Sequence, residues 1–277
     1  MKNKYIREEH VQKAKELLSK MTLREKIGQL NLKDYYAESD ADAIKCGDLG
    51  NIFFVTGVEL TNKLQKMAVE ETRLGIPMLF GFDIIHGHRT TFPIPIATAA
   101  SWDLDLIESC ERVAAEESYS QGINWIYAPM VDLCREPRWG RIAEGAGEDP
   151  FLGASIAAAR VRGFQTINPK TGYPYTAACF KHFCGYGLAE GGRDYDTTDI
   201  SERTLFGEYL KTYQGAIDAG AMSTMSSFNC LNGEPVSGSY HYLTEVLRQR
   251  MGFEGFVVSD YIASMELKNH RTAANDK

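Results

Sequence analysis

The chain has 277 residues, of which 44% are apolar, so it can bury a core as one large domain or two ordinary ones. Its formal net charge is −7 and no Lys/Arg-rich block occurs, which argues against nucleic acid or an anionic membrane as the main partner. A small neutral ligand fits this composition better. The cysteines lack paired spacings such as C-x-x-C, so we expect free thiols, no disulfide framework, and no metal or other cofactor. They are Cys46, Cys110, Cys134, Cys179, Cys184 and Cys230.

The first thirty residues predict two helices and no targeting signal. The stretch MKNKYIREEHVQKAKELLSK has no apolar h-region, and no window in the chain approaches the roughly eighteen apolar residues of a membrane span, which predicts a cytoplasmic location. Thr22 and Glu25 form a T-x-x-E capping box that begins a second short helix through Ile27 and Leu30. Apolar residues at helical spacing predict the first helix: Val11, Ala14, Leu17, Leu18 and Met21.

Six short apolar runs follow, and helical segments separate them. The runs are apolar on both faces, which is typical of strands in a parallel sheet that is covered on both sides. They are LGNIFFV (49–55), IPMLFGFD (76–83), INWIYAPMVD (123–132), TAACFKHF (176–183), AMSTMSSFN (221–229) and GFVVSD (255–260). Helices are predicted over 101–122, 200–220 and 242–252, and each of these segments ends on a glycine.

Polar residues at the ends of these runs favour a barrel over a doubly wound sheet. Barrel enzymes assemble their active sites at the C-terminal ends of several strands. A doubly wound sheet would concentrate its ligands at one switch point and show a glycine-rich phosphate turn, which this sequence lacks. We therefore predict an α/β fold, a (β/α)8 TIM-type barrel, in a single domain over 1–277. The strand-end residues are Asp83, Asp132, Lys181 with His182, Asn229 and Asp260.

The predicted barrel is incomplete. Six clear strands and a possible first strand at IGQLN (27–31) make six or seven, and closure needs an eighth. A βα unit takes roughly thirty residues, whereas seventeen follow Asp260. We expect the chain to stop inside its last repeat. An open edge of this kind should expose apolar surface and favour self-association or a partner chain.

Two polar segments suggest other chemistries. His86 and His88, at the end of the strand that carries Asp83, could belong to the metal site of an amidohydrolase, although histidines hydrogen-bonded within a loop are the favoured interpretation. Lys181 could be a Schiff-base nucleophile. The dense carboxylates that follow it instead favour a lysine that donates to hydroxyl groups or forms an ion pair in the barrel mouth.

The loop DLCREPRWGRIAEGAGEDP (132–150) is far longer than the usual connection between a strand and a helix. Long ordered loops often carry function. Trp139 within it could offer an apolar face for stacking on a sugar ring.

Several motifs in register resemble the N-terminal domain of glycoside hydrolase family 3, the β-glucosidase and β-xylosidase family. The resemblance runs from about Met21 to Tyr261 and is closest to bacterial β-glucosidases. The motifs are MTLREKIGQL, GFDIIHGHRTTFPIP, APMVDLCREPRWGRIAEGAGEDP, KHFCGYGLAEGGRDYDTTDISERTL and SSFNCLNGEPVSGSYHYLTEVLRQRMGFEGFVVSDY.

The resemblance implies a retaining glycosidase that acts on a β-glucoside or a short β-linked oligosaccharide. In this two-step route one carboxylate attacks the anomeric carbon and a second carboxylic acid protonates the leaving oxygen. Asp260 matches the family's nucleophile. The residues that match the glucose-binding subsite are Asp83, Arg141, Lys181, His182 and Met225.

The sequence also departs from the family's pattern. Phe228 stands where many members have a tyrosine whose hydroxyl touches the nucleophile, and Tyr261 replaces the usual tryptophan as a smaller aromatic wall on the leaving-group side. In a single-domain branch that acts on N-acetylglucosamine, the proton donor is a histidine in the loop after KHF. That loop here, CGYGLAEGGRDYDTTDIS, contains no histidine, which disfavours that branch.

The glucosidase branch takes its acid/base glutamate from a second, C-terminal α/β domain. The resemblance gives that role to none of the acids in nearby loops, which are Glu144, Glu148 and Glu190. We therefore expect a shortened family member that holds the nucleophile without its acid partner and has weak activity. The alternative is a non-catalytic sugar-binding remnant, or a fragment that works only with a partner chain.

Overall fold

A computed structural model describes residues 3–275. Seven parallel strands form one curled sheet in the order β1-β2-β3-β4-β5-β6-β9, which matches an incomplete (β/α) barrel. The sheet strands are β1 (Leu32–Asp34), β2 (Asn51–Phe53), β3 (Leu79–Phe82), β4 (Trp125–Ile126), β5 (Ala177–Phe183), β6 (Ser223–Ser226) and β9 (Phe256–Ser259). A small antiparallel hairpin, β7 (Cys230–Leu231) and β8 (Glu234–Pro235), follows β6.

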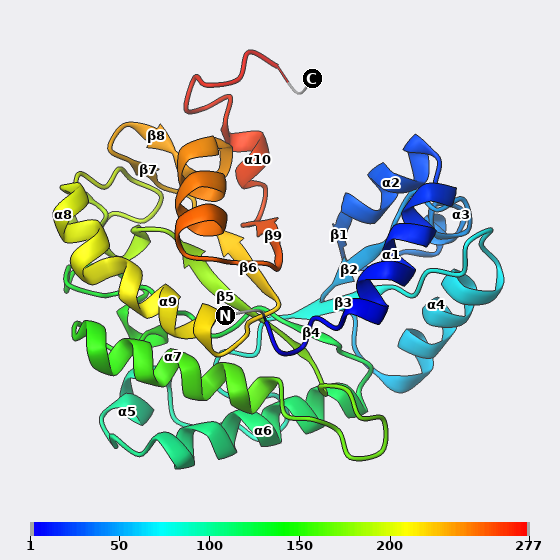
Figure 1. Ribbon diagram of the computed structural model, residues 1–277, viewed down its shortest axis with the longest axis horizontal. Coiled ribbons are helices and arrows are strands. Elements are labelled where there is room, and N and C mark those ends of the chain that lie inside the picture. Colours follow the sequence, from blue (N-terminus) through cyan, green and yellow to red (C-terminus); the bar gives the residue numbers. More distant parts are fainter. Residues whose placement is uncertain (1–2, 276–277) are drawn as a thin grey trace.

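Helices cover the outside of this sheet (Figure 1). The first four are α1 (Glu8–Lys20), α2 (Leu23–Leu30), α3 (Ala41–Lys45) and α4 (Val58–Glu70). Next come α5 (Pro95–Ala99), α6 (Leu104–Ser120) and α7 (Pro150–Phe164). The last are α8 (Glu202–Thr204), a π-helical segment Leu205–Tyr209, α9 (Leu210–Asp218), a second π-helical segment His241–Arg250 and α10 (Ala263–Glu266). Short 3-10 turns lie at Glu38–Asp40, Ile142–Glu144, Tyr186–Leu188, Glu190–Gly192 and Val236–Gly238.

The six predicted strands are all present, and each of the five predicted helices corresponds to a helical segment, the last of which is π-helical. The first strand differs from its predicted place: Ile27 to Leu30 belong to α2, and β1 begins at Leu32. The capping box explains the difference. Glu25 N–H donates to Thr22 Oγ1 over 3.3 Å, and Thr22 N–H donates to a Glu25 carboxylate oxygen over 2.8 Å, so the helix begins at Leu23 and includes the apolar run.

Two apolar layers hold the curled sheet. The larger core lies between the outer face of the sheet and helices α6, α7 and α9, with Phe164, Phe180 and Tyr213 fully buried in it. A second layer fills the inside of the curl around Trp125 and Tyr127, and Trp125 Nε1 donates to Ser223 Oγ over 2.8 Å. These layers fix how the strands curl, and therefore where their C-terminal ends meet.

The sheet does not close. Among the described residues, β1 and β9 each pair with one neighbour only, and Figure 1 shows the blue N-terminal helices on one side of the opening and β9 with α10 on the other. The predicted N-terminal helix forms, but none of its described residues is buried. Exposed apolar side chains line this side of the molecule: Leu18, Leu23, Ile27 and Leu30. The apolar side of α2 and Leu18 of α1 therefore remain uncovered, as expected for an open barrel.

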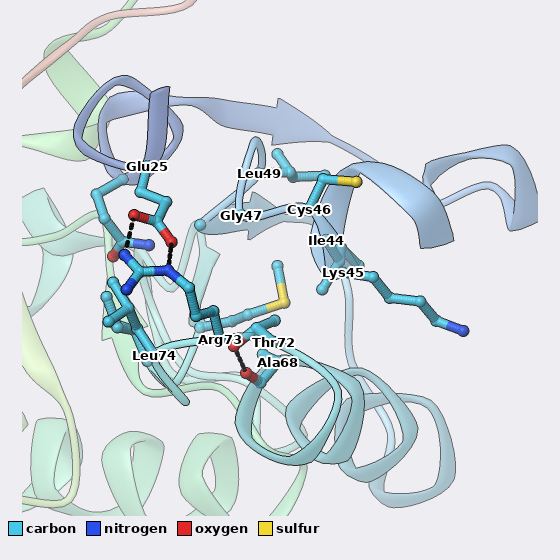
Figure 2. Close-up of a pocket in the computed structure, with 14 residues that line it drawn as sticks. Glu25, Ile44, Lys45, Cys46, Gly47, Leu49, Ala68, Thr72, Arg73 and Leu74 are labelled. Atoms are coloured by element: carbon cyan, nitrogen blue, oxygen red, sulfur yellow. Dashed lines mark hydrogen bonds and ion pairs between the residues drawn. The ribbon is translucent and has the colours of Figure 1, made fainter. Parts of the chain in front are cut away.

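A small hollow lies at the other end of the strands, next to Leu49, Gly50 and Met78 (Figure 2). Its volume is about 50 Å³. The Arg73–Glu25 ion pair, 2.6 Å between Nη2 and Oε2, crosses it and ties α2 to the loop after α4. This hollow is too small for a sugar, and we interpret it as a packing gap beneath the barrel.

Gly28 places α2 against the loop after α3, because a Cβ there would lie 1.8 Å from the Gly47 carbonyl oxygen. Gly28→Ala should lower the free energy of unfolding by about 2 kcal/mol, since overpacking against backbone outweighs the helical preference for alanine. Urea denaturation followed by circular dichroism measures this. Gly207→Ala is the matched control, because a Cβ there meets nothing within 4 Å and should raise stability by about 0.5 kcal/mol. Equal effects would contradict the packing argument.

Candidate active site

The C-terminal ends of the strands meet beside a cleft with a volume of about 790 Å³, lined from both edges of the open sheet. Asp83 directly follows β3, Met225 lies in β6, and Asp260 directly follows β9; all three line the cleft. Tyr261 lines its rim and is half exposed. The sequence placed these side chains on separate strands, and the parallel register brings them to one mouth.

Asp260 is held as a buried carboxylate with one free oxygen. Its Oδ1 accepts from the Tyr261 backbone N–H over 2.7 Å. Its Oδ2 is buried without a hydrogen-bond partner and lies 3.5 Å from His182 Nε2. Asp260 is only 8% exposed, so an unpartnered carboxylate oxygen here is costly unless a ligand group satisfies it.

Lys181 and Asp83 form an ion pair inside the barrel mouth. Lys181 Nζ lies 2.5 Å from Asp83 Oδ1, and the lysine side chain is 5% exposed whereas that of Asp83 is 40% exposed. The structure thus contains the ion pair that the sequence left as one alternative. An ammonium paired in this way is a hydrogen-bond donor, and a Schiff-base role for Lys181 finds no support.

His182 is buried beneath the mouth between two carboxylates. Its Nδ1 lies 2.9 Å from Asp132 Oδ2, and its other ring nitrogen, Nε2, lies 3.5 Å from Asp260 Oδ2. Burial, assisted by Arg141, lowers the pKa of His182 to about 3, although Asp260 acts to raise it. The imidazole is therefore neutral at neutral pH.

Arg141 reaches the same region, and an ion pair occupies part of its guanidinium. Its guanidinium binds the Glu144 carboxylate through Nε at 2.7 Å and Nη2 at 3.0 Å, and it lies over the ring of Tyr186. The ring of Tyr186 also contacts the imidazole of His182, with 5.2 Å between ring centroids. Arg141 thus borders the site through Tyr186, and no direct contact with Asp260 is made.

Trp139 does not serve as the stacking platform suggested by the sequence. It is 1% exposed and packs on Tyr186, and its Nε1 donates to Asp194 Oδ1 over 3.0 Å. The long loop therefore uses Trp139 as its own core. Phe228 is also buried and packs on Tyr186 and Tyr195.

The histidines after β3 belong to a loop. His86 Nδ1 lies 2.9 Å from the Phe92 carbonyl oxygen, as expected for the hydrogen-bonded interpretation. Over residues 3–275 no group of three or more His, Cys, Asp or Glu side chains is arranged to hold a metal ion. The amidohydrolase alternative therefore has no support from the described geometry.

Sequence reasoning missed two side chains around this site. Tyr213, in α9, donates its hydroxyl to Asp132 over 2.8 Å, and Asp34 at the end of β1 accepts from the Tyr261 hydroxyl over 3.2 Å. Asp34 does follow a strand, so a correct placement of β1 would have found it. Tyr213 lies within a helical run and gives no signal in the sequence.

The family model described as "Glycosyl hydrolase family 3 N terminal domain" matches residues 22–276. The chain belongs to glycoside hydrolase family 3. It is 40% identical over 264 residues to a periplasmic beta-glucosidase of Salmonella typhimurium, covering 94% of this chain and 34% of that enzyme. It is also 33% identical to a lysosomal beta glucosidase of Dictyostelium discoideum, covering 88% of this chain and 34% of that enzyme.

The fold agrees with this family assignment. A beta-glucosidase of Listeria innocua, solved in complex with isofagomine, superposes with a TM-score of 0.88 at 37% identity, covering 98% of this chain and 39% of that one. This family 3 chain therefore spans about a third of the length of the curated relatives it matches. In the described part of the chain, no helix is both long and apolar enough to cross a bilayer. Because one relative is named as periplasmic, the cytoplasmic location stays a prediction.

A fully buried ion pair supports the strand end that carries Asp83. Arg160 in α7 donates to Glu111 Oε1 in α6 and to the Ile85 carbonyl oxygen, both over 2.5 Å. Burial raises the pKa of Glu111, while Arg160 acts to lower it. The two helices thereby fix the loop two residues after Asp83.

Removing the cation should have unequal consequences at the buried Arg160–Glu111 pair and at the Lys181–Asp83 pair, whose carboxylate is partly exposed. Arg160→Met leaves Glu111 uncompensated at 8% side-chain exposure and should cost about 3 kcal/mol of unfolding free energy. Lys181→Met leaves Asp83 without its cation. Because water can reach this carboxylate, the free energy of unfolding should change by less than about 1 kcal/mol. Parallel urea denaturation of both variants measures this. A larger loss for Lys181→Met than for Arg160→Met would contradict it.

Proposed function

We propose that this family 3 chain carries the part of a retaining β-glucosidase that contains the nucleophile, to which the glycosyl group of the substrate is transferred. The observation that carries the proposal is the free, buried Asp260 Oδ2 at a cleft of sufficient size for a sugar. Asp260 would attack the anomeric carbon, forming a covalent bond as the bond to the leaving oxygen breaks. The β-glucosidase names of the relatives, and the solved complexes of the Listeria enzyme with glucose and laminaribiose, support a β-glucoside as substrate.

The surrounding side chains would bind and orient the sugar ring. Lys181 presents ammonium hydrogens, and Asp83 presents carboxylate oxygens that water can still reach. Met225 lines the same cleft, and Tyr261 stands at its rim on the proposed leaving-group side. Fixing the ring in this way lowers the barrier by positioning the anomeric carbon against Asp260.

The proposed site lacks an evident proton donor for the leaving oxygen. Glu144, one of the nearby acids, is occupied by Arg141 through two hydrogen bonds. We propose that no acid within the chain protonates the leaving oxygen, and that relatives supply this acid from the part of their length that the chain does not match. Loss of general acid assistance typically lowers the rate by about 10²–10⁴. Leaving groups that depart without a proton escape this penalty.

The test uses 2,4-dinitrophenyl β-D-glucopyranoside, whose leaving group needs no proton. We expect a burst of up to one equivalent of dinitrophenolate per chain, followed by slow turnover that azide accelerates by replacing the poorly activated water. Mass spectrometry should find the glucosyl group on the peptide containing Asp260. Asp260→Asn should abolish the burst, whereas Asp42→Asn, an exposed aspartate in α3, should retain it.

The unactivated disaccharide laminaribiose should react at least about 100-fold more slowly than the dinitrophenyl glucoside. Glucose release measured by an enzyme-coupled assay provides the comparison. Ordinary turnover of laminaribiose would show that the chain contains its own acid. Saturable binding of isofagomine with no burst would instead identify a non-catalytic sugar-binding remnant.

A second candidate function is that of a fragment completed by another polypeptide. The unpaired edges of β1 and β9 face each other across the cleft, and exposed apolar side chains stand on both sides of it. They include Leu30 on one side and Phe256, Tyr261, Ile262 and Met265 on the other. A strand from a second chain could pair with either edge and cover this surface.

Association through the opening should appear in light scattering. The weight-average mass should rise with concentration, and Leu30→Glu should reduce this rise, because a charge on the rim opposes burial. Val69→Glu is the control, since Val69 is an exposed residue of α4 that does not line the cleft. A constant monomer mass for the unmodified chain would exclude this association.

A further inference from the structure

Asp132 lies beneath the site and makes no contact with the cleft itself. It is 2% exposed. Its Oδ2 accepts from both the backbone N–H and the Nδ1 of His182, each over 2.9 Å. The Tyr213 hydroxyl lies 2.8 Å from Asp132 Oδ1 and 2.9 Å from the His182 carbonyl oxygen. Asp132 and Tyr213 thus hold the backbone and ring of His182 as one unit.

These contacts decide which ring nitrogen carries the hydrogen. Burial raises the pKa of Asp132 to about 6, while the Tyr213 hydroxyl and the His182 amide act to lower it, so Asp132 is mainly ionised at neutral pH. An ionised carboxylate can only accept hydrogen bonds. His182 Nδ1 is therefore the protonated nitrogen, and in a neutral imidazole the other nitrogen, Nε2, has a free lone pair.

The groups around the imidazole leave it neutral. Arg141 and Lys181 lower the pKa of His182 in addition to burial, whereas Asp260 and Glu144 raise it. The ring of Tyr186 covers one side, and Asp132 occupies Nδ1. His182 Nε2 consequently faces Asp260 Oδ2 across 3.5 Å, and both atoms are hydrogen-bond acceptors. Because His182 Nε2 offers no hydrogen to it, the buried Asp260 Oδ2 needs a donor from outside, and a group bound there can also donate to Nε2.

We propose that Asp132 is a positioning residue that makes His182 an acceptor for a sugar hydroxyl rather than a donor to it. This inference rests on the proposed function and deepens it. A hydroxyl of the bound sugar donates its hydrogen to Nε2, which orients the ring and leaves the lone pairs of Asp260 available for attack. The site thereby selects for a sugar that carries a hydroxyl at this place, because fluorine or hydrogen there cannot donate.

The experiment combines ring ¹⁵N NMR of histidine with the dinitrophenolate burst. In the unmodified chain between pH 6.5 and 8, we expect His182 to show a protonated Nδ1 and an unprotonated Nε2, with the signal assigned by its loss in His182→Gln. Asp132→Ala should lose this tautomer preference and slow the burst about 100-fold, as expected for a misplaced ring. Circular dichroism checks that the variant folds.

Asp132→Asn keeps the shape and removes the charge. The His182 backbone N–H donates to the same oxygen that receives Nδ1, so the asparagine oxygen should take that place and its amide should face Tyr213. We expect the Nδ1–H tautomer to persist and the burst to stay within about tenfold of the unmodified rate. This variant supplies the test if Asp132→Ala fails to fold.

A protonated Nε2 in the unmodified chain would overturn the proposal. A burst in Asp132→Asn that is as slow as in Asp132→Ala, or a burst in Asp132→Ala equal to that of the unmodified chain, would do the same. The NMR result does not depend on turnover. Absence of any burst in the unmodified chain, together with the expected tautomer, would therefore defeat the proposed glycosidase activity and not the assignment of the imidazole.

Discussion

The parallel alignment of seven strands in a curled sheet is the constraint on which the rest of the structure depends. Because every strand runs the same way, every C-terminal end opens on the same mouth, and residues as far apart as Asp83 and Lys181 come within 2.5 Å. The core between the sheet and helices α6, α7 and α9 fixes the curl. The loops at the mouth are then free to carry polar side chains that no core could accept.

Most polar and charged side chains at the barrel mouth have a partner within the protein. Lys181 is paired with Asp83 and Arg141 with Glu144, while Asp132 is hydrogen-bonded to the ring of the neutral His182. Asp260 Oδ2 is an exception, since it is buried without a hydrogen-bond partner, and so is the hydroxyl of Tyr127, which lines the same cleft. In a site whose other hydrogen bonds are largely satisfied, such an atom is the place at which a ligand contributes most.

The opening between β1 and β9 leaves two strand edges unpaired in the described part of the chain, with exposed apolar side chains beside them. The chain belongs to glycoside hydrolase family 3 but spans about a third of the length of its curated relatives. An unpaired strand edge and an apolar trough are surfaces that proteins normally cover. Tyr261, Ile262 and Met265 line the cleft on the β9 side of this opening.

The sequence by itself determined the strands, the barrel type, the family and the strand-end residues, because apolar runs with polar tips are local patterns. It placed the first strand inside α2, since an apolar run next to a capping box fits either element. The tertiary structure alone decided which hydrogen-bond partner each polar group has. Tyr213 meets Asp132 across 81 positions of chain, and Trp139 turns inward to Asp194. Such contacts depend on how the loops and helices pack around the mouth, and no local pattern in the sequence records that packing.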